Sequence, residues 1–249
     1  MRFFTVLWLM LTVAWPAKDA LADVKAMKIL KNYEKKYSNY KALYVKMKLY
    51  VQGQHKATME SRNRPSGQRL LKLLYPGDVK GMQILVQSQS EMYIYLPAFR
   101  KVRRIAGHVR NQGFLGSGFT YDDMSIAYWS KSYTVRLQSE TPKHWTVDLK
   151  ARPGKSALYR HLRIRIRKDI GYADRFLYFN RHGKNYKTQK FLRYDGCTAA
   201  QAHCNPNRIE MIEHSRGNRK SVLKNVKTKY KKRYSDRVYT IRYLLRSAN

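Results

Sequence analysis

The pattern of hydrophobic and polar residues changes its period near residue 41. Before that point, apolar side chains recur at steps of three and four residues among lysines, as in an amphipathic helix. After it, apolar and polar residues alternate with a period of two, which is typical of strands with one buried face. The sequence therefore predicts one helix followed by a long series of strands. The apolar stripe of the helix comprises Val24, Met27, Leu30, Tyr33 and Tyr37.

Short polar turns, such as Pro76-Gly77-Asp78 and Ser88-Gln89-Ser90, separate the strands and predict an antiparallel meander. In the stretch from Leu162 to Arg167, three apolar residues share one face and three arginines share the other. Many strands with one dry face, together with one amphipathic helix, predict a mainly β fold with helices (α+β), in which a half-barrel wraps a helix. The predicted strands are 41–51, 55–61, 68–75, 81–87, 91–96, 100–105, 133–138, 144–150, 158–167, 174–179, 186–193, 207–213, 220–228 and 236–244.

Residues 1–22 have the features of a secretory signal peptide. Arg2 gives a basic start, an apolar run extends from Phe3 to Trp15, and Ala20-Leu21-Ala22 is a cleavage site of the A-x-A type. The run is shorter than the roughly 20 residues that a membrane-spanning helix needs. We expect cleavage after Ala22 and export of residues 23–249, which form a single domain because no linker or repeat divides them.

The chain is strongly basic, with 51 Lys and Arg residues against 16 Asp and Glu and a net charge of +35. Nucleic acid is not the expected partner of an exported protein. Anionic lipid head groups, lipopolysaccharide phosphates or an acidic protein fit this charge. A solvated surface that prevents aggregation is the alternative. The candidate docking face consists of Arg163, Arg165 and Arg167, which the same alternative explains as a solvated outer face.

The two cysteines, Cys197 and Cys204, lie close together in a polar stretch. In an oxidising compartment such a pair predicts one short-loop disulfide. A metal site that uses both thiols and His203 lacks an evident fourth ligand and the spacing of a zinc knuckle. We therefore expect no metal and no cofactor.

No catalytic motif is evident: the sequence contains neither G-x-S-x-G nor H-E-x-x-H, and its seven histidines show no informative spacing. The glycines of 113–118 do not have the order or the βαβ context of a dinucleotide-binding loop. We expect no enzymatic activity. Thr120 and Asp123 match the N-cap and N3 positions of a short helix through Met124 and Trp129. The same segment is a candidate lid or hinge over a cavity, formed by Phe114, Leu115, Gly116, Phe119 and Tyr121.

Several tracts together resemble a known family: residues 95–105, residues 114–117 and 119–123, and residues 239–244. They are similar to the outer-membrane lipoprotein-sorting proteins, which are LolA-like periplasmic proteins often associated with RND-type transporters. The resemblance extends over essentially all of residues 23–249. It implies an unclosed antiparallel β-barrel whose concave side is covered by the N-terminal helix and short helices. It also implies a periplasmic location and a hydrophobic cavity that receives acyl chains of lipid or lipoprotein.

Two features depart from the family pattern. Gly118 stands where the family usually has an acidic residue, and the segment between Cys197 and Cys204 resembles an insertion. The function that the resemblance implies is that of a carrier or chaperone for outer-membrane lipoprotein sorting or lipid transfer, or of an accessory to an RND-type transporter. The expected cavity lining lies on alternating strand positions: Leu43, Val45, Met47, Leu49, Met82, Ile84, Val86, Met92, Ile94 and Leu96.

A basic adaptor without acyl cargo is the competing function. It would bind polyanions or membrane surfaces with a steep salt dependence, whereas acyl cargo should bind with a weak one. Apart from the three arginines of the candidate docking face, its cationic residues are Lys227, Lys229, Lys231, Lys232 and Arg233.

Overall fold

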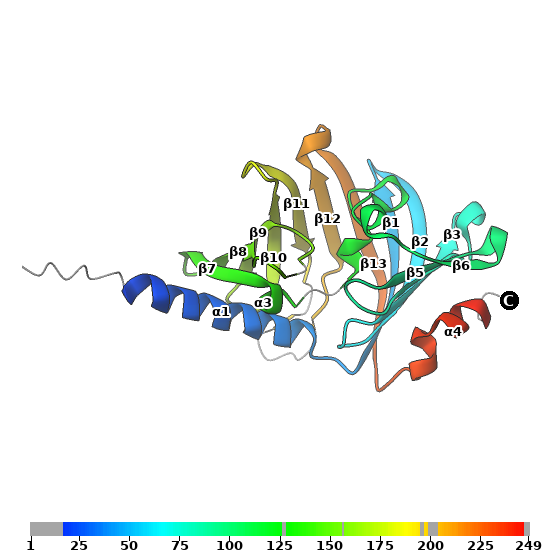
Figure 1. Cartoon of the computed structure of the whole chain (residues 1–249), viewed down its shortest axis with the longest axis horizontal. Helices are drawn as coiled ribbons and strands as arrows, with labels where there is room; N and C mark the ends of the chain where they lie inside the picture. The colour runs from blue at the N-terminus through cyan, green and yellow to red at the C-terminus, as the bar shows by residue number, and fades with distance from the viewer. Residues whose placement is uncertain (1–16, 126–127, 156, 195–196, 199–203, 247–249) are drawn as a thin grey trace, which may run out of the picture.

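The protein forms one strongly curved antiparallel sheet that does not close into a barrel (Figure 1). The structure, a computed structural model, describes residues 17–125, 128–155, 157–194, 197–198 and 204–246. Within them, thirteen strands follow the order β6-β5-β4-β3-β2-β1-β13-β12-β11-β10-β9-β8-β7. Strand β1 pairs with both β2 and β13, so the sheet extends in both directions from its centre. Strands β6 and β7 are its edges, which confirms the predicted unclosed barrel.

Four α-helices accompany the strands in the described part of the chain. The helices are α1 (Ala17–Tyr37), α2 (Gly107–Arg110), α3 (Trp129–Ser132) and α4 (Ile241–Arg246). The strands are β1 (Ala42–Val51), β2 (Gln54–Asn63), β3 (Arg69–Tyr75), β4 (Gln83–Val86), β5 (Met92–Leu96), β6 (Lys101–Arg104), β7 (Tyr133–Glu140), β8 (His144–Ala151), β9 (His161–Arg167), β10 (Ala173–Phe179), β11 (Asn185–Leu192), β12 (Arg208–Glu213) and β13 (Arg219–Lys231).

The alternation of apolar and polar residues correctly predicts the inner face of the sheet. In β9, Leu162, Ile164 and Ile166 are buried, while the arginines between them lie on the other face. The inward side chains join one large core that also contains residues of α1. Each observed strand corresponds to a predicted one, because a sheet with one dry face imposes the period of two along its whole length.

The prediction of a strand at 236–244 is wrong. This segment forms a 3-10 turn, Asp236–Tyr239, followed by α4. The Thr240 hydroxyl accepts a hydrogen bond from the Tyr243 backbone N–H at 3.2 Å and so caps the helix. Tyr239 and Leu244 are buried against the outer face of the sheet, where α4 lies beside β5 and β6 (Figure 1). The outer cluster consists of Leu70, Leu85, Tyr95, Tyr239 and Leu244.

Helix α1 covers the sheet near β7, as predicted, but its buried stripe is rotated (Figure 1). Ala26, Ile29, Leu30 and Tyr33 are buried, whereas Val24 is 68% exposed. Small Ala26 allows the helix to approach the sheet closely, so the stripe passes through it rather than through Val24. The predicted contribution of Val24 is therefore wrong, while those of Leu30 and Tyr33 are confirmed.

Glu34 of α1 is a buried acidic residue, 8% exposed, and it connects α1 to α3. Its carboxylate accepts hydrogen bonds from the Ser130 backbone N–H at 2.8 Å and from the Ser130 hydroxyl at 2.6 Å. Burial raises the pKa of Glu34, and these two hydrogen bonds oppose the rise. The polar contact thus sets the position of the helix over the sheet.

The predicted capping arrangement at Thr120 and Asp123 is present, but the helix that it opens is shorter than expected. The Thr120 N–H donates to the Asp123 carboxylate at 2.8 Å, and the Asp123 N–H donates to the Thr120 hydroxyl at 3.2 Å. Only a 3-10 turn, Asp122–Met124, follows, and α3 is separate from it. The capping box therefore opens a single 3-10 turn rather than a helix that continues to Trp129.

The predicted signal peptide falls largely outside the described residues. The described residues begin within it, at Ala17, and the predicted cleavage site after Ala22 falls inside α1. No described helix combines the length and apolar character needed to span a bilayer. The predicted disulfide is confirmed: Cys197 and Cys204 are bonded, with their Cα atoms 5.8 Å apart. His203 lies outside the described residues.

Candidate functional site

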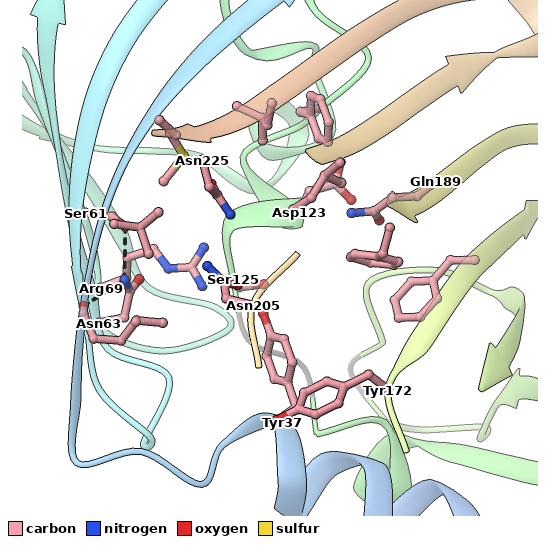
Figure 2. Close-up of a pocket in the computed structure, with 18 of the residues that line it drawn as sticks. Tyr37, Ser61, Asn63, Arg69, Asp123, Ser125, Tyr172, Gln189, Asn205 and Asn225 are labelled. Carbon is pink, nitrogen blue, oxygen red and sulfur yellow. Dashed lines mark hydrogen bonds between the residues drawn. The ribbon is translucent and has the colours of Figure 1, made fainter. Parts of the chain in front are cut away.

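A cavity of about 190 Å³ lies on the concave side of the sheet, between β1, β10 and the C-terminal end of α1 (Figure 2). Strands β1, β12 and β13 form an aliphatic wall, while α1, α3, β10 and β11 form an aromatic wall. A third, polar group of side chains closes one end. The aliphatic wall contains Leu43, Val45, Met47, Ile209 and Leu223, and the aromatic wall contains Tyr33, Trp129, Phe176, Tyr178 and Phe191.

Three of the ten predicted lining residues border this cavity: Leu43, Val45 and Met47. Six of the others belong to the main core or pack against it, and only Leu96 lies outside it. Leu96 is half-buried at the end of β5 and joins no buried cluster. Leu49, Ile84, Val86 and Met92 are buried in the main core, and Met82 and Ile94 pack against it.

The aromatic wall was not among the predicted lining residues. Trp129 lies 6.0 Å from Tyr33 and 5.4 Å from Phe176, measured between ring centroids. Phe176 and Tyr178 alternate on β10, so the period of two that identified the strand also places them on the inner face. The contribution of α1 and α3 depends on tertiary packing, which has no comparable local signal.

The predicted lid segment is folded against the core. Phe114 and Phe119 are buried, and the Phe114 N–H donates to the Phe119 carbonyl at 2.7 Å. Leu115 adopts a left-handed conformation that brings the chain back on itself, and Gly116 follows with φ +70°. Tyr121 packs edge-on against Phe114. Phe119 borders the cavity, so the segment forms part of its wall, and movement as a lid stays a prediction.

Gly118 fits a position that has no space for a side chain. A Cβ atom there would lie 2.9 Å from the Glu213 side chain and 3.0 Å from that of Met211. The Gly118 N–H donates to the Ser221 hydroxyl at 2.9 Å, which fastens the segment to β13. The departure from the family pattern at residue 118 therefore fits this structure, because the β12 side chains leave no space for a side chain at that position.

A buried polar network connects the same segment to β11. The Lys187 ammonium lies 2.9 Å from the Asp123 carboxylate, with side chains only 5% and 8% exposed. The Tyr159 hydroxyl donates to Asp123 at 2.5 Å, and the Lys187 ammonium lies 4.8 Å from the centre of the Tyr178 ring. Burial, followed by the charge of Asp123, raises the pKa of Tyr159 well above its usual range. Tyr159 is therefore neutral and a hydrogen-bond donor at physiological pH.

Asp122 borders the cavity beside this network. Its carboxylate lies 3.7 Å from the Arg110 guanidinium, beyond hydrogen-bonding distance. Burial raises the pKa of Asp122, while the charge of Arg110 opposes the rise. The two acidic residues of the cavity thus each have a basic residue nearby, and the network has the structural role of holding the wall together.

Each arginine of the predicted docking face has a carboxylate partner within the protein. Arg165 forms two hydrogen bonds of 2.8 Å with Asp174, and the Nε atom of Arg163 lies 3.0 Å from Asp148. Arg167 pairs with Asp169. These pairs neutralise much of the charge that the strand pattern suggested, so Arg163, Arg165 and Arg167 remain only a proposal as a docking face.

Comparisons with known proteins agree with this architecture. An outer membrane lipoprotein-sorting protein domain from Vibrio parahaemolyticus has a TM-score of 0.78 at 16% identity, covering 90% of this chain and 99% of that one. A DUF1329 family protein from Desulfovibrio piger has a TM-score of 0.78 at 17% identity, with the same two coverages. A LolA superfamily protein from Nitrosomonas europaea has a TM-score of 0.69 at 15% identity, covering 88% and 98%.

None of these three descriptions names a catalytic activity, in agreement with the expectation from the sequence. No curated protein matches the chain. A family model described as "Uncharacterized protein" matches residues 65–246. Since that match covers more than half of the chain, the protein belongs to this family, and its fold is that of the LolA-like lipoprotein-sorting proteins.

Proposed function

We propose that the protein is a periplasmic, non-enzymatic carrier that binds acyl chains of lipid or lipoprotein in the cavity. The observation that carries this proposal is an apolar and aromatic cavity on the concave side of an unclosed barrel. The signal-like residues 1–22 and the disulfide support an exported location. Transfer between membranes requires a membrane partner, for which the family resemblance favours an RND-type transporter.

The size of the cavity indicates how an acyl chain would fit. Its volume of about 190 Å³ is below the roughly 300–1,000 Å³ of typical ligand pockets, so it accommodates only part of a long chain in this state. Each buried methylene contributes about 0.8 kcal/mol. Carrier action therefore requires the wall to widen, and tyrosine and methionine side chains suit such a wall because they adapt to both apolar and polar contacts.

A fatty acid brominated at mid-chain should quench the fluorescence of Trp129. Trp129 lines the cavity, whereas Trp145, the other tryptophan after residue 22, does not. We expect saturable quenching in the wild type and in Trp145→Phe, and loss of most quenching in Trp129→Phe, where an aromatic ring is retained. Absence of quenching in the wild type, or equal loss in both variants, would contradict binding in the cavity.

The second candidate function, docking on an anionic membrane surface, is favoured by the outer face of β1 and β13. There Lys46 lies directly opposite Lys227, and Lys48 lies opposite Lys224. Like charges at directly opposed positions destabilise a sheet unless a counter-charge is present. Glu60 lies opposite Lys46 on β2, where it accepts a hydrogen bond from Tyr44 and lies 3.7 Å from Arg62. The nearby Glu210 is already paired with Arg208 and Lys220. We include docking of these lysines on anionic phospholipid in the proposal, as the way in which the carrier approaches its source of cargo.

The double variant Lys46→Gln, Lys227→Gln should bind anionic vesicles about 30-fold more weakly, since each lysine near such a surface contributes about 1 kcal/mol. The matched control, Lys155→Gln with Lys184→Gln, removes two exposed charges elsewhere and should change binding less than about threefold. Co-sedimentation with phosphatidylglycerol vesicles measures both. Equal losses in the two double variants would show that net charge, rather than this face, determines binding.

A further inference from the structure

The polar end of the cavity results from a change in the inward residues of two neighbouring strands. Along β2 the inward positions pass from Ala57 and Met59 to Ser61 and Asn63. In β3 the residue that pairs with Asn63 is Arg69, which shares the inward face with the buried Leu71 and Leu73. Apolar residues at these inward positions would continue the core. Polar residues stand there instead, and Ser61, Asn63 and Arg69 all line the cavity.

Arg69 extends into the cavity and has no partner among the residues that the structure describes (Figure 2). Within the described residues its Nε atom is completely buried without a hydrogen-bond partner, while the side chain as a whole is partly exposed. The amide oxygen of Asn63 beside it is likewise buried without a donor. A buried N–H donor is normally hydrogen-bonded, because leaving it without an acceptor is costly. The Arg69 guanidinium is therefore available to an acceptor group that enters the cavity.

Of the two carboxylates in the described lining, Asp123 is paired within the fold, whereas the Asp122 Oδ1 atom is buried without a hydrogen-bond partner. Asp123 is bound to Lys187 and Tyr159, and Asp122 faces Arg110. Lys36 of α1 also lines the cavity, and its ammonium lies over the Tyr172 ring. The charge of Arg69 acts on its surroundings, since it opposes the rise in the pKa of Tyr40 that burial causes. The polar end of the cavity thus favours an anion.

We propose that Arg69 binds the anionic head of an acylated ligand whose chain lies along the aliphatic wall. Leu43 of β1 lies opposite Asn63, and Val45 lies opposite Ser61, so this wall begins directly beside the polar end. A carboxylate or a phosphate matches the planar, multidentate donor set of a guanidinium. This inference rests on the proposed acyl-carrier function and specifies its ligand class: an anionic amphiphile rather than a neutral one.

Ligands that differ only in the head group test the inference. Displacement of the uncharged dye N-phenyl-1-naphthylamine at pH 8 compares palmitate with hexadecanol, which has the same chain length. We expect the wild type to bind palmitate at least about tenfold more tightly, as is typical for a charged hydrogen bond. Arg69→Met should remove this preference by weakening palmitate and not hexadecanol, while Arg69→Lys should retain part of it.

Arg103→Met is the matched control, because Arg103 carries the same charge on the exposed edge strand β6 and should leave the preference intact. Palmitoyl lysophosphatidate, tested in parallel, distinguishes a phosphate source from a carboxylate source, since Arg69→Met affects the true head group more. Equal binding of palmitate and hexadecanol to the wild type would overturn the inference while leaving the acyl carrier intact. Failure of every ligand to displace the dye would overturn the proposed function and the inference with it. The wild-type comparison decides even if Arg69→Met does not fold.

Discussion

Replacement of Lys187 by methionine is expected to lower the free energy of unfolding by about 3–5 kcal/mol, because it leaves the buried Asp123 carboxylate without its counter-charge. The Lys187 side chain also packs over the Tyr159 and Tyr178 rings, so the network and the cavity wall would loosen together. Urea unfolding at pH 7 gives the free energy, provided that the denaturant slope is unchanged.

Two further variants make this result specific to the ion pair. The double variant Lys187→Met, Asp123→Asn should recover part of the loss, because it removes both buried charges. Lys184→Met, in the exposed turn before β11, should change the free energy by less than about 0.5 kcal/mol. If Lys187→Met costs no more than Lys184→Met, the pair does not hold the segment to β11.

Met47→Trp is expected to reduce acyl binding with little effect on the fold. Met47 lines the cavity and is only partly buried, so a larger side chain can extend into the open volume. If it displaces about two to three methylenes of a ligand at about 0.8 kcal/mol each, affinity falls roughly 15- to 60-fold. Displacement of N-phenyl-1-naphthylamine by palmitate measures the change.

Val226→Trp provides the control for this substitution. Val226 is 55% exposed on β13, close to Met47 in the sheet register but at the bulge on that strand. The same aromatic ring placed there should leave palmitate affinity within about twofold, as surface substitutions generally have small effects. Comparable losses in the two variants would indicate that binding depends on general stability rather than on cavity volume.

The local pattern determined the strands because β-sheet burial repeats every two residues, and β9 shows this in the alternation of Leu162, Ile164 and Ile166 with arginines. It failed at 236–244, where Tyr239 and Leu244 pack on the outside of the sheet and thus give no alternation with an inner core. The helix cap at Thr240 is a weak signal in the sequence, because the neighbouring tyrosines are residues that also favour strands. A segment that packs on the outer face of the sheet therefore cannot be identified from the period of two.

The site was only partly predictable for the same reason. Leu43, Val45 and Met47 follow from the period of β1, but Trp129 and Tyr33 reach the cavity through the docking of α1 and α3. The charge of Arg163, Arg165 and Arg167 was evident in the sequence. The partners of the first two, Asp148 and Asp174, lie on the neighbouring strands β8 and β10, whereas Asp169 follows Arg167 by two residues. Arg69 has no signal in the strand pattern, because the lack of a hydrogen-bond partner for its Nε atom among the described residues is a property of the fold.

Native mass spectrometry with solvent extraction, on protein purified from the periplasm without detergent, tests the carrier function most directly. We expect a population of protein with one acyl-bearing molecule bound, and an anionic head group on the extracted ligand. Met47→Trp should reduce that population, and Val226→Trp should not. Protein that is uniformly empty, yet still binds anionic vesicles, would contradict acyl carriage and leave membrane-surface docking as the function.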